Sequence, residues 1–176
     1  MSAQPRRWTW LLDLITTVTV LIGLTFGAIE LRQIKNAQEA QTVLQLFETL
    51  RSPEIVRGIG LIKSLPDTTS PETLNAMWEA GTEDWYHMEQ VLLAYEGLGV
   101  MVFREDVSIE WVDEMFRNSI LTAWARFEEQ TVQYRAASGN GHISEWLQWL
   151  AERLQERDPD AVGPAYEAYR DWEPGS

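Results

Sequence analysis

Residues 10–29 read WLLDLITTVTVLIGLTFGAI, and this apolar run decides the architecture of the chain. At a rise of about 1.5 Å per residue, a helix of this length spans about 30 Å, the thickness of the hydrocarbon core of a bilayer. A buried helix of a soluble domain would show a polar stripe, which the threonines and Asp13 do not form. The sequence therefore predicts a transmembrane helix over residues 10–30, preceded by a tail over residues 1–9.

The flanks of the run agree with a membrane anchor. Trp8 and Trp10 lie where an aromatic belt meets the headgroups, and Arg6 and Arg7 lie just outside it. A cleaved signal peptide is the alternative, but the run is long for one and no small-residue cleavage pattern precedes Glu30. Basic residues are nearly balanced between the two flanks, so they do not decide the orientation.

Small residues share one face of the predicted transmembrane helix. Gly23 and Gly27 have the spacing that lets a second helix approach closely, and Thr19 extends the same face. This pattern predicts a helix–helix contact with a second copy or with another membrane protein. Because glycine is common in membrane helices, the same spacing also arises by chance.

The charge of the chain is unevenly distributed. Four basic and two acidic side chains give residues 1–35 a charge of +2, which leaves −15 for residues 36–176 out of the total of −13. Phosphate backbones repel such a domain, so nucleic acid is not expected as a partner. The absence of cysteine excludes disulfides, thiolate metal sites and cysteine nucleophiles.

Helical periodicity continues from the membrane run to Leu50, which predicts a stiff stalk over residues 31–50. Ser52-Pro53-Glu54 is the first helix start, and an acidic helical domain is predicted over residues 51–158, followed by a tail over residues 159–176. Further helices are expected from Ser52 to Ser64, from Ser70 to Gly81, from Thr82 to Val102, from Ser108 to Ser138, from Ile143 to Leu154, and briefly around Tyr166. No segment has strand alternation. The fold class is therefore all-α, one transmembrane helix that continues into a soluble helical bundle.

Tryptophan is abundant, with nine residues in the chain. Four are predicted to fill the core because they lie on or near apolar stripes: Trp85, Trp111, Trp124 and Trp146. Trp149 and Trp172 lie off these stripes. Since tryptophan is enriched where proteins bind one another, these two are candidate interface residues.

Residues that would carry catalysis or metal binding are sparse. His87 and His142 are the two histidines, and neither lies in the paired Glu-x-x-His pattern of a di-iron bundle, so no metal or other cofactor is expected. Gly58-Ile59-Gly60 lies in an apolar helix, which favours close helix packing over phosphate binding. The acid pairs are expected on solvated faces: Glu105-Asp106, Asp113-Glu114 and Glu128-Glu129.

Glu96 is the carboxylate that needs an explanation, because it lies in the otherwise apolar stretch from Leu92 to Val102. An unpaired buried charge is costly, so a partner is required. Arg126 and Arg135 are the candidate partners for a structural ion pair. A catalytic acid is the alternative role.

Several short motifs occur in a recognisable order after the membrane helix: Gln38-Glu39-Ala40-Gln41, Leu50-Arg51-Ser52-Pro53-Glu54, Tyr95-Glu96-Gly97-Leu98-Gly99, Trp124, Arg135 and Glu145-Trp146-Leu147. Over residues 30–150 the chain resembles a family of uncharacterised bacterial membrane-anchored helical proteins known only as a domain of unknown function. The resemblance implies a tethered helical fold, with the domain on the cytoplasmic side of the bacterial inner membrane. It implies no activity, cofactor or catalytic residue.

We therefore expect a membrane-anchored, non-enzymatic interaction module, serving as an accessory or scaffold subunit of a larger membrane protein assembly. Its expected partners are the lipid bilayer and, through the transmembrane helix, a membrane protein or a second copy. The alternative is a membrane-tethered enzyme or small-ligand sensor, with Glu96, Arg135 and His87 lining a pocket between helices. A signalling adaptor would differ from the first hypothesis only in having a transient partner.

Overall fold

The structure is a computed structural model that describes residues 9–157 and 165–173. Of residues 9–13, 15, 35, 36 and 38–40 it describes only the backbone. The predicted membrane-interface side chains of Arg6, Arg7, Trp8 and Trp10 therefore lie outside the description.

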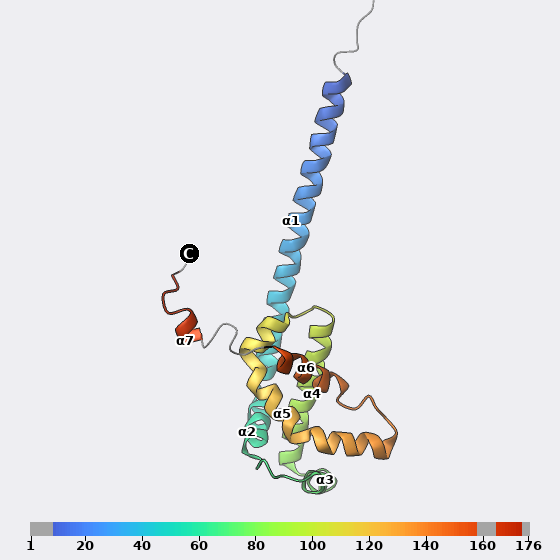
Figure 1. Ribbon diagram of the computed structural model, residues 1–176, viewed down its shortest axis with the longest axis vertical. Helices are drawn as coiled ribbons and strands as arrows, with labels where there is room; N and C mark the ends of the chain where they lie inside the picture. The colour runs from blue at the N-terminus through green and yellow to red at the C-terminus, as the bar shows by residue number, and fades with distance from the viewer. Residues whose placement is uncertain (1–8, 158–164, 174–176) are drawn as a thin grey trace, which may run out of the picture. The chain divides into compact units, whose positions relative to one another are not determined.

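Every regular element in the described part of the chain is a helix, which confirms the all-α fold class. The helices in Figure 1 are α1 (Thr9–Leu50), α2 (Pro53–Ser64), α3 (Pro71–Glu79), α4 (Glu83–Phe103), α5 (Ile109–Ser138), α6 (Glu145–Glu156) and α7 (Ala165–Ala168). The chain divides into two compact units, Met1–Gln45 and Leu46–Ser176.

The first unit consists, where it is described, of the greater part of α1. Its stretch Thr16–Ile34 contains 19 residues of mean hydropathy 1.3, none of them buried within the chain. This confirms an N-terminal helix long and apolar enough to cross a membrane.

The second unit begins inside α1, at Leu46, whereas the sequence placed the boundary of the helical domain at residue 51. Phe47 packs edge to face against Trp111 of α5, with ring centroids 5.5 Å apart, and Leu50 is buried. The last turn of α1 therefore belongs to the helical unit, because its apolar side chains lie in that unit's core.

Four helix starts in this unit are confirmed by their caps. Each capping side chain accepts a hydrogen bond from the backbone N–H three residues later, namely Ser52 from Ile55, Ser70 from Thr73, Thr82 from Trp85, and Ser108 from Trp111. Such a cap satisfies one of the free N–H groups of a first helical turn and contributes about 1 kcal/mol. The cap residues explain why α2 to α5 begin within one residue of their predicted starts.

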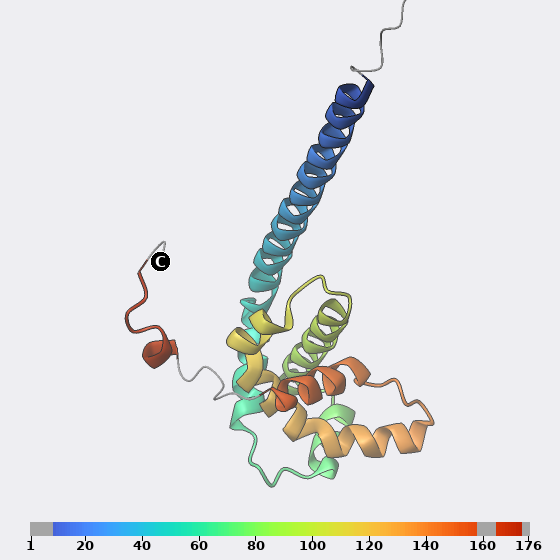
Figure 2. The same cartoon turned by 45° about the horizontal axis from the view of Figure 1, so that its top comes forward.

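Helix α4 is the centre of the unit. Helices α2 and α6 both pack against it, and α6 also packs against α5, as Figure 2 shows. Val91, Tyr95 and Leu98 of α4 are fully enclosed by these neighbours. Burial of each such side chain contributes about 2 kcal/mol, so α4 supplies much of the hydrophobic stabilisation.

Gly58 sets the distance between α2 and α4. A Cβ atom placed on Gly58 would lie 2.2 Å from the backbone oxygen of His87, so only glycine fits there. This confirms the packing role expected for this glycine. Gly60 has nothing within 4 Å of a placed Cβ and takes no part in the contact.

Candidate functional site

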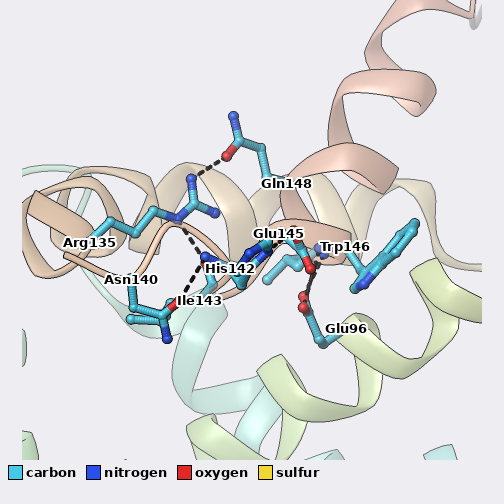
Figure 3. Close-up of polar contacts among 9 residues, drawn as sticks. Glu96, Arg135, Asn140, His142, Ile143, Glu145, Trp146 and Gln148 are labelled. Carbon is cyan, nitrogen blue, oxygen red and sulfur yellow. Dashed lines mark hydrogen bonds and ion pairs between the residues drawn. The ribbon is translucent and has the colours of Figure 1, made fainter. Parts of the chain in front are cut away.

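Glu96 of α4 binds the start of α6. Its Oε1 atom accepts the backbone N–H of Trp146 at 3.2 Å, and its Oε2 atom accepts that of Leu147 at 2.7 Å (Figure 3). The local residue in the capping position, Ser144, makes no capping hydrogen bond and has a left-handed backbone, with φ 52°. The carboxylate therefore caps α6 from another helix, where the helix dipole favours a negative charge.

The predicted ion pair between Glu96 and Arg126 or Arg135 is wrong. Arg126 pairs instead with Asp67. Arg135 donates from Nε to the backbone oxygen of Ile143 at 2.8 Å and from Nη1 to Gln148 at 2.6 Å. Free N–H groups at a helix start bind a carboxylate as a cation does, so Glu96 needs no arginine.

Gly99 brings the two helices close enough for this contact. A Cβ atom on Gly99 would lie 2.4 Å from the backbone oxygen of Trp146. Gly99 lies about one turn after Glu96 on the same face of α4, so the small residue and the capping carboxylate act together.

Arg135 and its neighbours hold the turn between α5 and α6, drawn in Figure 3. Gly139 ends α5 in a left-handed conformation, with φ 69°. The side chain of Asn140 accepts the backbone N–H of His142, and the Nδ1 atom of His142 lies 2.8 Å from Glu145. The turn is therefore ordered by polar contacts, although His142 is largely exposed.

Another polar cluster joins α5 to the end of α6. Asp113 pairs with Arg117 at 2.6 Å and with Arg157 at 3.0 Å, and Arg117 also donates to the backbone oxygen of Arg157. The expectation that Asp113 lies on a solvated face is wrong, since its side chain is only 20% exposed. Arg157 is 44 residues away in the sequence, and Arg117 lies one turn later among other polar residues of α5, so no sequence pattern indicated this cluster.

A pocket of about 410 Å³ lies beside Glu96, between α3, α4, α5 and the start of α6. Its apolar lining includes Trp78, Trp85, Leu92, Leu93, Phe127 and Tyr134. Its polar lining includes Asn75, Glu89, Glu96, Gln130 and Ser144. Of the residues proposed to line a pocket, Glu96 lines this one, and neither Arg135 nor His87 does.

The polar lining residues differ in whether they have partners. Gln130 is buried and donates to Asn75 at 2.8 Å. Glu89 is half-buried, and its side chain makes no hydrogen bond or ion pair within the described part of the chain. Its position two turns before Glu96 on α4 was the signal that could have identified it from sequence.

His87 is a packing residue. It is 9% exposed, and its Nε2 atom lies 3.5 Å from Glu83 one turn earlier. Its backbone oxygen faces Gly58 in the contact between α2 and α4. Among the described residues no group of three His, Asp or Glu side chains is placed to hold a metal ion.

The candidate interface tryptophans have different surroundings. Trp149 is half-buried and joins a surface cluster with Phe103 and Trp146, with ring centroids 4.8 to 6.1 Å apart. Phe103 is 58% exposed. Trp172 follows α7 and is 65% exposed. Of the tryptophans predicted as core, Trp124 is buried and the other three are half-buried.

Comparison with known proteins identifies one sequence family. The model of a family described as "Domain of unknown function (DUF4760)" matches residues 17–154. No curated protein and no solved structure matches the chain. The match includes all but the first residue of the candidate membrane span and the whole region from α2 to α6 except the last two residues of α6.

Proposed function

The chain belongs to the DUF4760 family of domains of unknown function, and from this premise we propose that it is a membrane-anchored, non-enzymatic interaction module. It serves as an accessory or scaffold subunit of a larger membrane protein assembly. Its helical unit lies on the cytoplasmic side of a bacterial inner membrane, as the resemblance of its motifs implies.

The exposed apolar surface of α1 carries this proposal. Leu24, Phe26 and Leu31 are 67–70% exposed, and the stretch Thr16–Ile34 has no buried residue. If this surface faced water, each of these side chains would lose the favourable free energy of about 2 kcal/mol that its burial provides. A hydrocarbon core of about 30 Å accommodates this stretch, which is about 28 Å long as a helix.

One face of the span is suited to a second helix. Thr19 and Gly23 are exposed, and a Cβ atom placed on Gly23 or Gly27 would meet nothing within 4 Å. Backbones that approach closely over such a face gain van der Waals contact, which drives helix association in lipid. The partner is a second copy of the chain or a helix of another membrane protein.

The helical unit offers a second contact surface in the cluster of Phe103, Trp146 and Trp149. Large aromatic side chains at a surface are typical anchors of protein interfaces. Phe103 is the most exposed of the three, so a partner that covers it would gain the most apolar burial.

Extraction from native membranes in a gentle detergent, followed by sizing and mass spectrometry, tests the proposal. We expect stoichiometric partners or a homodimer, which Gly23→Leu/Gly27→Leu disrupts. The matched control Thr25→Leu/Ala28→Leu adds similar bulk away from that face and leaves the assembly intact. A wild-type chain that is monomeric and alone would contradict the proposal, and an assembly unaffected by the glycine variants would exclude this helix face.

A membrane-tethered small-ligand sensor is a second candidate function. The pocket beside Glu96 favours it, because its volume of about 410 Å³ and its mixture of aromatic and polar lining are typical of ligand sites. Thermal unfolding of the solubilised chain against a panel of small cations, anions and neutral compounds tests this candidate. It is excluded if no compound raises the unfolding temperature.

A further inference from the structure

We propose that the pocket between α3, α4 and α5 binds a small organic cation, an amine or quaternary ammonium with apolar substituents. The inference rests on the sensor candidate and names the chemical class of its ligand. It is independent of whether the helix α1 has a partner.

Two aromatic pairs line the pocket. Trp78 of α3 and Tyr134 of α5 meet edge to face, with centroids 5.5 Å apart at 84°. Trp85 of α4 and Phe127 of α5 meet at 6.0 Å and 64°. Aromatic rings from three helices thus surround one space, and aromatic rings attract organic cations through their quadrupoles.

The charges of the lining residues have one sign. Glu89 and Glu96 both lie on α4, about two turns apart, and none of the described lining residues is Lys, Arg or His. Glu96 is already bound to the start of α6, whereas Glu89 has no partner within the described residues. Glu89 is therefore the carboxylate available to pair with a ligand.

This distribution discriminates between ligand classes. An anion would be repelled by Glu89 and by the acidic domain around it. A neutral apolar ligand would remove water from the Glu89 carboxylate without replacing its hydration. A cation pairs with that carboxylate and places its apolar substituents against the rings, so the carboxylate and the rings both gain a partner.

Gln130 gives the pocket a second acceptor for an amine. The side-chain nitrogen of Gln130 donates to Asn75, and within the described residues its carbonyl oxygen accepts no hydrogen bond. A protonated amine can donate there and to Glu89. A quaternary ammonium relies on Glu89 and the rings alone.

Three probes that share one ring and differ in charge test the proposal: benzyltrimethylammonium, benzyl alcohol and phenylacetate. Each is titrated by calorimetry into the full-length chain in nonionic detergent. We expect the cation to bind and the other two to bind at least about tenfold more weakly, as cation–π and charge pairing together imply.

Variants locate the binding. Glu89→Gln is expected to weaken binding of the cation by about tenfold. Glu128→Gln removes the same charge from an exposed position on α5 and controls for the overall field of the domain. Trp78→Leu is expected to weaken binding of the cation. Tyr86 is an exposed aromatic residue outside the lining, so Tyr86→Leu is expected to leave binding unchanged. Unchanged unfolding temperatures without probe show that each variant is folded.

Each outcome has a definite meaning. Equal weakening by Glu89→Gln and Glu128→Gln would overturn the proposal, because the cation would then sense only the overall charge. Benzyl alcohol or phenylacetate binding as tightly as the cation would overturn the ligand class while the sensor function stands. If none of the probes binds, the cation proposal fails. The sensor function is then tested by the panel of small cations, anions and neutral compounds described above.

Discussion

Glu96 and Leu147 are 51 positions apart in the sequence, and the carboxylate of the first accepts the backbone N–H of the second over 2.7 Å. The contact fixes the start of α6 against the middle of α4. Glu96 also lines the pocket, so the stability of α6 and the lining of the pocket depend on the same side chain.

Removal of the Glu96 carboxylate is expected to destabilise the helical unit. Glu96→Ala leaves two N–H groups at the start of α6 without an acceptor and should lower the free energy of unfolding by about 2 kcal/mol. Glu96→Gln keeps an acceptor but loses the charge, so a loss of about 1 kcal/mol is expected. Denaturant unfolding in detergent, followed by circular dichroism, measures both. Glu89→Gln on the same helix should cause little change, and an equal loss there would argue against the capping role.

Gly99→Ala and Gly97→Ala form a matched pair on α4. The Cβ atom at residue 99 would meet the backbone oxygen of Trp146, so this change should destabilise by about 1–3 kcal/mol. The Cβ atom at residue 97 meets nothing within 4 Å, and alanine should stabilise the helix by up to about 1 kcal/mol. Thermal unfolding of the two variants compares them directly. Effects of the same sign would show that the close contact between α4 and α6 is not needed.

Asp113→Asn should weaken the attachment of the end of α6 to α5. It removes the negative charge that lies between Arg117 and Arg157, of which Arg117 is only 16% exposed. A loss of about 2 kcal/mol is expected, because a partly buried arginine remains without its counter-ion. Glu156→Gln breaks only the exposed pair with Arg153 and should change stability by less than about 1 kcal/mol. Equal unfolding midpoints for the two variants would contradict this assignment.

Stability should fall at alkaline pH through Tyr95. Burial raises the pKa of Tyr95, and the hydrogen bond with Ser119 lowers it to a smaller extent. The unfolded chain releases the phenol proton near pH 10 while the folded chain retains it, so this contribution is complete below pH 10 and is lost as the pH rises through the folded pKa. Tyr95→Phe should therefore reduce the slope of unfolding free energy between about pH 9 and 11. Identical slopes for wild type and variant would contradict the buried-phenol account.

The side of the membrane occupied by the helical unit can be read from a single cysteine, because the chain contains none. Glu128→Cys places a thiol at an exposed position of α5. For a cytoplasmic unit, a membrane-impermeant maleimide should label inverted vesicles and leave intact spheroplasts unlabelled. Labelling in intact spheroplasts would place the unit on the opposite side.

The boundaries of the helices were predictable because their signals are local. A serine or threonine cap followed by an acidic first turn acts over three residues, and all four such starts are confirmed. The long α1 was predictable for the same reason, since no glycine or proline interrupts its helical pattern after Gly27.

The partner of Glu96 was not predictable in the same way. A carboxylate in an apolar stretch indicates that a partner exists, but a helix start becomes a partner only when packing brings it there. The sequence does contain the two sides of this contact as Tyr95-Glu96-Gly97-Leu98-Gly99 and Glu145-Trp146-Leu147, both among the motifs of the family resemblance. Their meeting required the arrangement of α4 and α6.

Because Glu96 of α4 supplies the cap of α6, we expect it to influence the order in which the helices of this unit form. Helix α6 has 12 residues and no side-chain cap of its own, a length at which an isolated helix is marginal in water. It acquires acceptors for its first N–H groups only after α4 is formed and in place. We therefore expect α6 to fold last and to open first, and its amide protons to exchange with solvent earlier than those of α4.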